Sequence, residues 1–355
     1  MSQLFTSVRI GRLTLPNRLV MAPMTRSRAD DAGVPSDLAA TYYAQRASAG
    51  LIISEGVYPV AMGKGYVRTP GIESDHVAAW TRVTEAVHAR GGRIFMQLMH
   101  CGRISHPSLL PGSAPPVAPS AIKPAGQTWT GAGMQEFVTP RALTVAEIAG
   151  IVEDYRQATR RALAAGFDGV ELHAASGYLP EQFLSSGSNQ RDDEYGGSAA
   201  NRSRFILEVL AAMAAEAGSD RVGIKISPEM GFNDIVDAAP EETYTYLVDQ
   251  LRNLKLAYLH VALFGAKTDY HALLRPRFNG AYLIGGGLDQ AGAEALITDG
   301  RADATVFGTA FLANPDLPER FRQGAPLNAP DKATFYTPGE QGYTDYPALN
   351  TAEAA

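Results

Sequence analysis

Eight short apolar segments, each separated from the next by longer polar or periodic stretches, constrain the fold of this chain most strongly. Short apolar runs of this length are typical of buried strands. Several of the intervening stretches, at residues 78–89, 144–165 and 202–217, have helical periodicity. Eight strands alternating with helices favour a closed (β/α)8 barrel over an open sheet, so we expect a TIM barrel of the α/β class. The predicted strands cover residues 18–22, 51–54, 93–97, 169–172, 222–226, 257–261, 281–284 and 304–307.

Local signals mark the ends of some of these elements. Thr144 and Glu147 have the spacing of a capping box at a helix start, and Gly166 is a plausible stop for the same helix. Residues 4–15 read as a short hairpin around Gly11, which could cover the end of the barrel opposite the active site.

Composition limits the class of protein. The 355 residues suit one large barrel domain spanning residues 1–355, and the net charge of −6 without a basic block argues against a nucleic-acid partner. The single cysteine, Cys101, rules out a disulfide within the chain and an all-cysteine metal site. The first residues lack signal-peptide features and no apolar run has membrane-spanning length. We therefore expect a soluble cytoplasmic protein, monomeric or homodimeric, without a membrane contact.

Two long segments, residues 101–140 and 174–200, follow the ends of predicted strands. Loops of this length in a compact domain are usually functional or disordered. Active sites of TIM barrels lie at the carboxyl ends of the strands, so both segments are expected to border the site.

One of these strand ends carries an imidazole, a hydroxyl and a phenol within six residues: His173, Ser176 and Tyr178. Together they could hold a substrate oxygen and deliver a proton. A lone histidine is more often a buried structural group, but the neighbouring Tyr178 and the long loop favour a site. No metal is predicted, because His173 lacks a second ligand at helical spacing.

The other strand ends supply Thr25, Gln97 and Lys225, and the last two strands run into glycines. Gly285 to Gly287 and Gly308 could let backbone amides approach a phosphate, with a helix from about Asp289 favouring an anion. Tight turns explain the same glycines equally well. Lys225 could instead form a Schiff base as in barrel aldolases, or simply pair with a neighbouring acid.

The sequence resembles the Old Yellow Enzyme family of flavin-dependent ene-reductases, particularly its pentaerythritol tetranitrate reductase and N-ethylmaleimide reductase branch. The similarity covers nearly the whole chain, with distinct motifs in the family's order. The matching stretches are residues 15–26, 97–103, 182–185, 189–198, 201–202, 313–317 and 342–347. The resemblance implies a TIM barrel that holds FMN without a covalent bond.

The resemblance also implies a set of cofactor-binding residues. Thr25 would bond the flavin near O4 and N5, Gln97 its pyrimidine edge, and the Lys225 cation would lie beside N1 and O2. The flavin ring would lie along Ala22, Pro23 and Met24. The phosphate would be held by Gly286, Gly287, Gly308 and Thr309.

The implied reaction begins with reduction of FMN by NADPH or NADH. Hydride then passes to the β-carbon of an enone, maleimide or nitroalkene, or a nitrate ester is reduced. Tyr178 would protonate the α-carbon, while His173 and Ser176 would bond the carbonyl or nitro oxygen. The residues expected to line the substrate pocket are Tyr66, Met99, Phe264 and Tyr343.

Four positions depart from the family pattern. Ser176 replaces an asparagine or second histidine, Met99 a bulky aromatic, and Lys225 and Thr309 replace arginines. These departures keep two alternatives open: a Schiff-base aldolase or lyase that uses Lys225, and a flavin-binding protein with altered activity.

Overall fold

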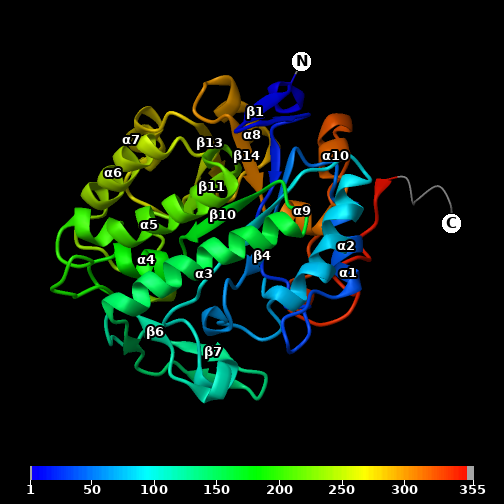
Figure 1. Ribbon diagram of the computed structural model, residues 1–355. Coiled ribbons are helices and arrows are strands. Elements are labelled where there is room, and N and C mark those ends of the chain that lie inside the picture. Colours follow the sequence, from blue (N-terminus) through cyan, green and yellow to red (C-terminus); the bar gives the residue numbers. More distant parts are fainter. Residues whose placement is uncertain (1, 350–355) are drawn as a thin grey trace.

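The computed structural model, which describes residues 2–349, contains a closed barrel of eight parallel strands surrounded by helices (Figure 1). Each strand pairs with the next along the chain, and pairing of Phe307 with Met21 closes the ring. The predicted TIM barrel is therefore confirmed. The strands are β3 (Leu19–Met21), β4 (Leu51–Val57), β5 (Ile94–Leu98), β10 (Gly169–Ala174), β11 (Val222–Ile226), β12 (Tyr258–Ala262), β13 (Ala281–Gly285) and β14 (Ala304–Phe307).

The barrel strands are buried on both faces, which is why they read as apolar runs and not as alternating patterns. Every residue of β4, β5, β10, β12 and β14 is buried. β4 extends three residues beyond the predicted strand, and its register with β5 shifts between Ile53 and Gly56. The polar Ser54 and Glu55 lie in this irregular part of the strand.

The helix after residue 143 forms as its sequence predicts. Thr144 Oγ accepts from the Glu147 N–H, Glu147 Oε2 accepts from the Thr144 N–H, and Gly166 follows the helix end at φ +88°. Within residues 2–349, each helix is too short or too polar to cross a lipid bilayer. The helices are α1 (Asp37–Gln45), α2 (Val77–His88), α3 (Val145–Ala164), α4 (Leu179–Leu184), α5 (Ala199–Ala217), α6 (Pro240–Leu251), α7 (Tyr270–Leu274), α8 (Gln290–Thr298), α9 (Thr309–Ala313) and α10 (Leu317–Gln323).

The predicted N-terminal hairpin consists of β1 (Val8–Ile10) and β2 (Leu13–Leu15). Ile10 and Leu15 are fully buried in one cluster with inward-facing barrel residues such as Phe95. Gly11 turns at φ +56°, where a Cβ would lie 2.0 Å from the Asp220 carbonyl oxygen just before β11. The hairpin therefore closes the amino-terminal end of the barrel, as expected.

The first long segment lies at the end of the molecule opposite β1, whereas α4, in the second long segment, lies between the two ends (Figure 1). Residues 101–140 contain β6 (Val117–Ala118) and a hairpin of β7 (Gln127–Trp129) and β8 (Met134–Glu136), and β6 pairs with β9 (Arg141–Ala142). The second segment is not entirely a loop, because it includes the buried helix α4.

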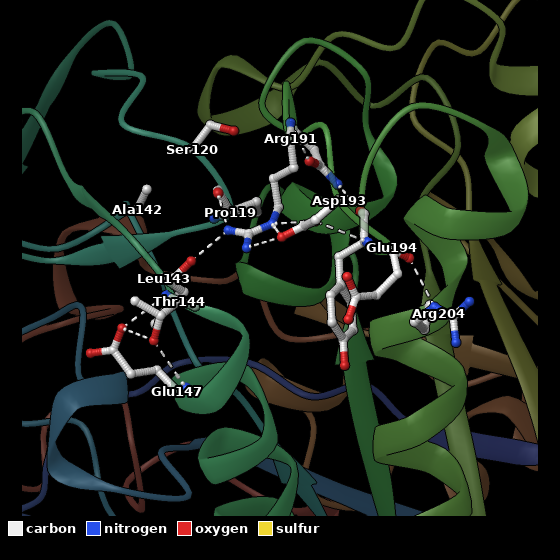
Figure 2. A network of polar contacts seen from close by, with 12 residues as sticks. Pro119, Ser120, Ala142, Leu143, Thr144, Glu147, Arg191, Asp193, Glu194 and Arg204 are labelled. Atoms are coloured by element: carbon white, nitrogen blue, oxygen red, sulfur yellow. Dashed lines mark hydrogen bonds and ion pairs between the residues drawn. The ribbon is translucent and has the colours of Figure 1, made fainter.

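A polar network joins these two segments (Figure 2). Arg191 donates to the carbonyl oxygens of Pro119 and Leu143 at 2.8 and 2.6 Å, and Arg204 of α5 donates to the Glu194 carbonyl at 2.8 Å. Residues 189–198, which carry the most specific family motif, thus brace the loops around the barrel mouth.

Candidate active site

The structure brings four of the predicted site residues together at the carboxyl ends of β5 and β10. The rings of His173 and Tyr178 are 4.8 Å apart with an interplanar angle of 80°. The hydroxyls of Tyr178 and Tyr66 are 3.0 Å apart. Met99 belongs to the same buried cluster as Tyr178, and Tyr66 packs against it. This arrangement places one imidazole and two phenols around a shared apolar wall.

Burial sets the protonation states of this pair. The pKa of His173 is lowered well below its ordinary value, mainly by burial and further by the Lys225 cation. Burial raises the pKa of Tyr178 well above its ordinary value. At neutral pH the imidazole is therefore neutral and the phenol keeps its proton. His173 Nδ1 is buried without a hydrogen-bond partner among the described residues, as expected of a group prepared for a ligand.

Ser176 lies on the turn between His173 and Tyr178, at φ +58°. Its Oγ is 3.6 Å from the sulfur of Met230, which is a weak acceptor. Among the described residues the Ser176 hydroxyl therefore has no strong acceptor, and it can donate a hydrogen bond to a substrate.

A cluster of polar side chains lies inside the barrel next to His173 and Tyr178. His173, Lys225 and His260 are register partners on three neighbouring strands, so their side chains lie on the same face. Glu171, fully buried, accepts from Gln97 Nε2 at 2.7 Å and lies 3.1 Å from His260 Nδ1. Burial lowers the pKa of Lys225, and the nearby carboxylates of Glu171 and Glu181 oppose that shift.

Glu171 and His260 were not predicted, although one signal was present. Side chains alternate along a strand, so Glu171 shares the face of His173 two residues later. Because Glu171 lies inside an apolar run, the sequence does not single it out as a neighbour of His173.

The glycine segments follow β13 and β14. Gly286 has φ +122°, and a Cβ there would lie 2.2 Å from the Leu263 carbonyl oxygen, so only glycine fits. Gly287 faces open space at φ +65°. A Cβ on Gly308 would lie 3.5 Å from Met24 Sδ and 3.8 Å from the Ala22 side chain, so the ends of β14 and β3 meet here.

The start of α8 differs from the anion site expected near residue 289. Asp289 caps this helix, and its carboxylate accepts from the Gly292 N–H at 2.8 Å. A negative side chain at that point disfavours a phosphate beside it. The first residue of α9, Thr309, is exposed. Backbone groups at Gly286, Gly287 and Gly308 are therefore the better candidates for phosphate contacts.

Other predicted residues come from different segments, and within the described part of the chain they form no hydrogen bond or ring contact with the His173–Tyr178 pair. Thr25 and Pro23 are half-buried just after β3, and Phe264 is 51% exposed after β12. Tyr343 is buried and stacks on Tyr42 with ring centres 4.2 Å apart.

The segment that carries Tyr343 is held by two buried arginines that sequence reasoning missed. Arg26 donates to the Gly342 carbonyl at 2.8 Å, and Arg28 donates to the Gln341 carbonyl at 2.7 Å. Both arginines follow β3, with Arg26 ending the motif of residues 15–26 and Arg28 lying two residues beyond it, and nothing in their local pattern indicates a partner more than 300 residues away.

The barrel, the glycine turns and the neutral imidazole beside a protonated phenol define the class of protein: a TIM barrel with a ligand site at the carboxyl ends of its strands. The chain belongs to the NADH:flavin oxidoreductase / NADH oxidase family, whose model matches residues 3–328.

Similar proteins agree with this assignment. A probable flavin mononucleotide-dependent alkene reductase of Leishmania infantum is 44% identical over 352 residues, covering 96% of each chain. The 12-oxophytodienoate reductase 1 of Oryza sativa subsp. japonica is 42% identical, covering 98% of this chain and 93% of its own length.

Solved structures agree as well. Morphinone reductase in complex with tetrahydroNAD is 49% identical and has a TM-score of 0.95, with 99% of both chains covered. The Old Yellow Enzyme homologue of Zymomonas mobilis is 41% identical with a TM-score of 0.95, covering 98% of this chain and 100% of that one. The predicted family and the prediction of FMN with a nicotinamide reductant are confirmed, and the aldolase alternative for Lys225 is set aside.

The residues present fit a flavin. The side-chain amide nitrogen of Gln97 donates to Glu171. This leaves the side-chain oxygen of Gln97 free to accept from a ring N–H. Lys225 supplies a half-buried cation that can stabilise an anionic reduced ring. Gly286 allows a ligand to approach the backbone closely.

Proposed function

We propose that this protein reduces activated carbon–carbon double bonds in enones, maleimides or nitroalkenes, and nitrate esters, at the expense of NADPH or NADH. The observation that carries the proposal is the buried pair of a neutral His173 and a protonated Tyr178 with ring centres 4.8 Å apart. Bound FMN supplies the hydride that it has accepted from the nicotinamide.

The flavin would be held by residues from five strand ends. Thr25, Gln97 and Lys225 would contact the ring system, with Ala22, Pro23 and Met24 along one side. Gly286, Gly287, Gly308 and Thr309 would surround the phosphate. Because Thr309 is neutral, affinity for the phosphate would depend mainly on backbone N–H groups.

His173 and Ser176 would donate hydrogen bonds to the carbonyl or nitro oxygen of the substrate. Negative charge grows on that oxygen as the β-carbon is reduced, so fixed donors lower the barrier, by about 2.7–4 kcal/mol for a strong one. Tyr178 would give its proton to the α-carbon. The pocket walls would come from Tyr66, Met99, Phe264 and Tyr343.

The proposal also covers the cellular location, the domain organisation and the assembly of the protein. We place the enzyme in the cytoplasm as one FMN-binding domain, residues 1–355, acting on a small molecule as a monomer or homodimer. Sedimentation of the purified holoenzyme would distinguish the two assemblies.

The function is tested by Tyr178→Phe in the FMN-loaded protein. The oxidative half-reaction with cyclohexenone should slow by about 10²-fold or more, because a positioned acid is lost. Reduction of the flavin by NADPH should stay close to wild type. Both steps are followed by stopped-flow flavin absorbance, with Tyr246→Phe, a partly exposed tyrosine of α6, as the control.

Equal losses in the two half-reactions would contradict the role of Tyr178 as the acid. A protein that does not bind FMN, or whose reduced flavin is not reoxidised by any activated alkene, would contradict the whole proposal.

A further inference from the structure

The turn that presents Ser176 and Tyr178 has an unusual backbone. Ser176 and Gly177 follow one another at φ +58° and +79°, both in the left-handed region. A Cβ on Gly177 would lie 2.6 Å from the Asn233 Cβ, so the turn is also packed tightly from outside. A non-glycine residue in this conformation costs free energy and persists only where its surroundings hold it.

Side chains from three separate segments form hydrogen bonds with three of the four backbone N–H and carbonyl groups of Ser176 and Gly177. The Ser176 N–H donates to Ser227 Oγ at 2.8 Å, and Asn233 Nδ2 donates to the Ser176 carbonyl at 2.8 Å. Gln182 Nε2 donates to the Gly177 carbonyl at 2.8 Å.

Glu181 binds the fourth backbone group, the Gly177 N–H. It is the only ionisable side chain among the four that bind this turn. Its Oε2 accepts from the Gly177 N–H at 2.6 Å, and its Oε1 accepts from Tyr244 Oη at 2.6 Å. Ser227 Oγ is a more distant donor at 3.5 Å. Glu181 is 2% exposed, and a buried carboxylate is tolerated where it accepts several hydrogen bonds. Through Tyr244, it connects the turn to α6.

We propose that Glu181 is a positioning residue for the reaction: its carboxylate fixes the Ser176–Gly177 turn and thereby the placement of the Tyr178 phenol against the substrate. The inference rests on the proposed function, because it assigns Glu181 a part in the step that Tyr178 performs. The Gly177 N–H is a fixed donor and requires an acceptor oxygen, whereas Tyr244 Oη can either donate or accept.

The ionised form of Glu181 suits both of its close contacts, since each oxygen accepts. Burial raises the pKa of Glu181 to about 7, despite the bonds from Tyr244, Gly177 and Ser227. The charged groups that face it are Asp237, ahead of α6, which raises that pKa, and Lys225 of β11. The placement of Tyr178 should therefore change with protonation near neutral pH.

A cavity of about 290 Å³ adjoins Glu181 and Tyr244 on the side away from Tyr178. Its wall also includes Asp237, Glu229 and Lys267, and it opens between exposed residues such as Val236. This cavity gives water a route to the carboxylate, so Glu181 can exchange its proton without disturbing the pocket.

Glu229 provides a matched control on the same side of the molecule. Its Oε2 accepts from the Lys267 N–H at 2.9 Å and its Oε1 from Tyr270 Oη at 3.2 Å, the same pair of donor types. Neither contact reaches the Ser176–Gly177 turn. Glu229→Gln and Tyr270→Phe therefore repeat the chemical changes of Glu181→Gln and Tyr244→Phe without touching the turn.

The first test uses Glu181→Ala in the holoenzyme. Hydrogen exchange at residues 175–178 should become faster, and alkene reduction should slow by about 10- to 100-fold because Tyr178 is misplaced. FMN affinity and flavin reduction by NADPH should stay near wild type, as should every property of Glu229→Gln. Unchanged exchange at the turn would overturn the inference.

The second test separates positioning from a merely structural role. In wild type the rate of alkene reduction should rise with pH around an apparent pKa of about 7. Glu181→Gln, which is uncharged at every pH as protonated Glu181 is, should lose this rise and keep a rate near the lower plateau. Tyr244→Phe removes a donor to the carboxylate and should move the rise to higher pH, whereas Tyr270→Phe should not.

A pH profile that survives in Glu181→Gln would overturn the inference even if Glu181→Ala is slow. If Tyr178→Phe leaves alkene reduction unchanged, the role of Tyr178 as proton donor fails, but hydrogen exchange in the Glu181 variants still decides whether the carboxylate fixes the turn.

Discussion

At the residue scale, the hydroxyl pair of Tyr66 and Tyr178 is the most specific contact in the site. Their oxygens are 3.0 Å apart, and burial raises the pKa of both phenols above the ordinary value. Tyr178 cannot easily remain as a phenolate after giving up a proton, since burial disfavours its charged form. Tyr66 is half-buried and its hydroxyl is within hydrogen-bonding distance of Tyr178.

Removal of the neighbouring hydroxyl should therefore slow proton delivery. Tyr66→Phe is expected to lower the rate of alkene reduction by roughly 3- to 10-fold, the worth of one ordinary hydrogen bond. Flavin reduction by NADPH should be unaffected. Single-turnover stopped-flow of each half-reaction measures both rates, and a faster alkene step in the variant would contradict this role.

Sequence reasoning located this group only in part. His173, Tyr178, Tyr66 and Met99 could be named because a strand end and family motifs mark them. Glu181 could not, because its contacts depend on the path of the chain: Tyr244 is 63 residues away. Hydrogen bonds between distant segments leave no periodicity in the local sequence.

At the element scale, strands were easier to predict than short helices. All eight barrel strands have an apolar run that burial on both faces requires. The sequence does not reveal helix α4, because the helix has only six residues and all are buried. Without an exposed face, it shows no amphipathic period.

The turn after β13 allows a paired test of how the phosphate is held. Gly286→Ala should weaken FMN binding by about tenfold or more, because a Cβ would lie 2.2 Å from the Leu263 carbonyl oxygen and displace the turn. Gly300→Ala, after α8 and outside the phosphate turn, also places alanine at positive φ but meets no atom within 4 Å. Its effect should be limited to about 1–2 kcal/mol of stability.

Fluorescence titration of the apoprotein with FMN gives the affinities, and urea denaturation gives the stabilities. Similar FMN affinities in the two alanine variants would show that close packing against Leu263 does not shape the phosphate turn.

At the scale of the whole molecule, stability should depend on a carboxylic acid buried in β4. Burial raises the pKa of Glu55 from 4.5 to about 7, although it accepts from the Arg26 N–H at 3.0 Å. Between these two pH values the unfolded chain has lost a proton that the folded protein keeps. The free energy of unfolding therefore falls as pH rises from about 4.5 to 7, and the contribution levels off above that.

Glu55→Gln should remove this dependence. Relative to wild type, the variant should gain up to about 3 kcal/mol in unfolding free energy between pH 5 and pH 8. Urea denaturation at the two pH values measures the change. Glu136→Gln is the control, because Lys123 lowers the pKa of that exposed group, so its titration lies below pH 5 and no relative change is expected between the two pH values. No relative gain for Glu55→Gln would indicate that Glu55 stays ionised beside Arg26.

The hairpin that closes the barrel floor has a consequence for biosynthesis. Ile10 is translated nearly 300 residues before Val306, a member of the same buried cluster, and the Ala22 N–H donates to the Phe307 carbonyl, 285 positions later. Such distant pairings cannot form before β14 has been translated. Until then part of this apolar cluster has no cover on the nascent chain, where it is open to chaperones or to aggregation.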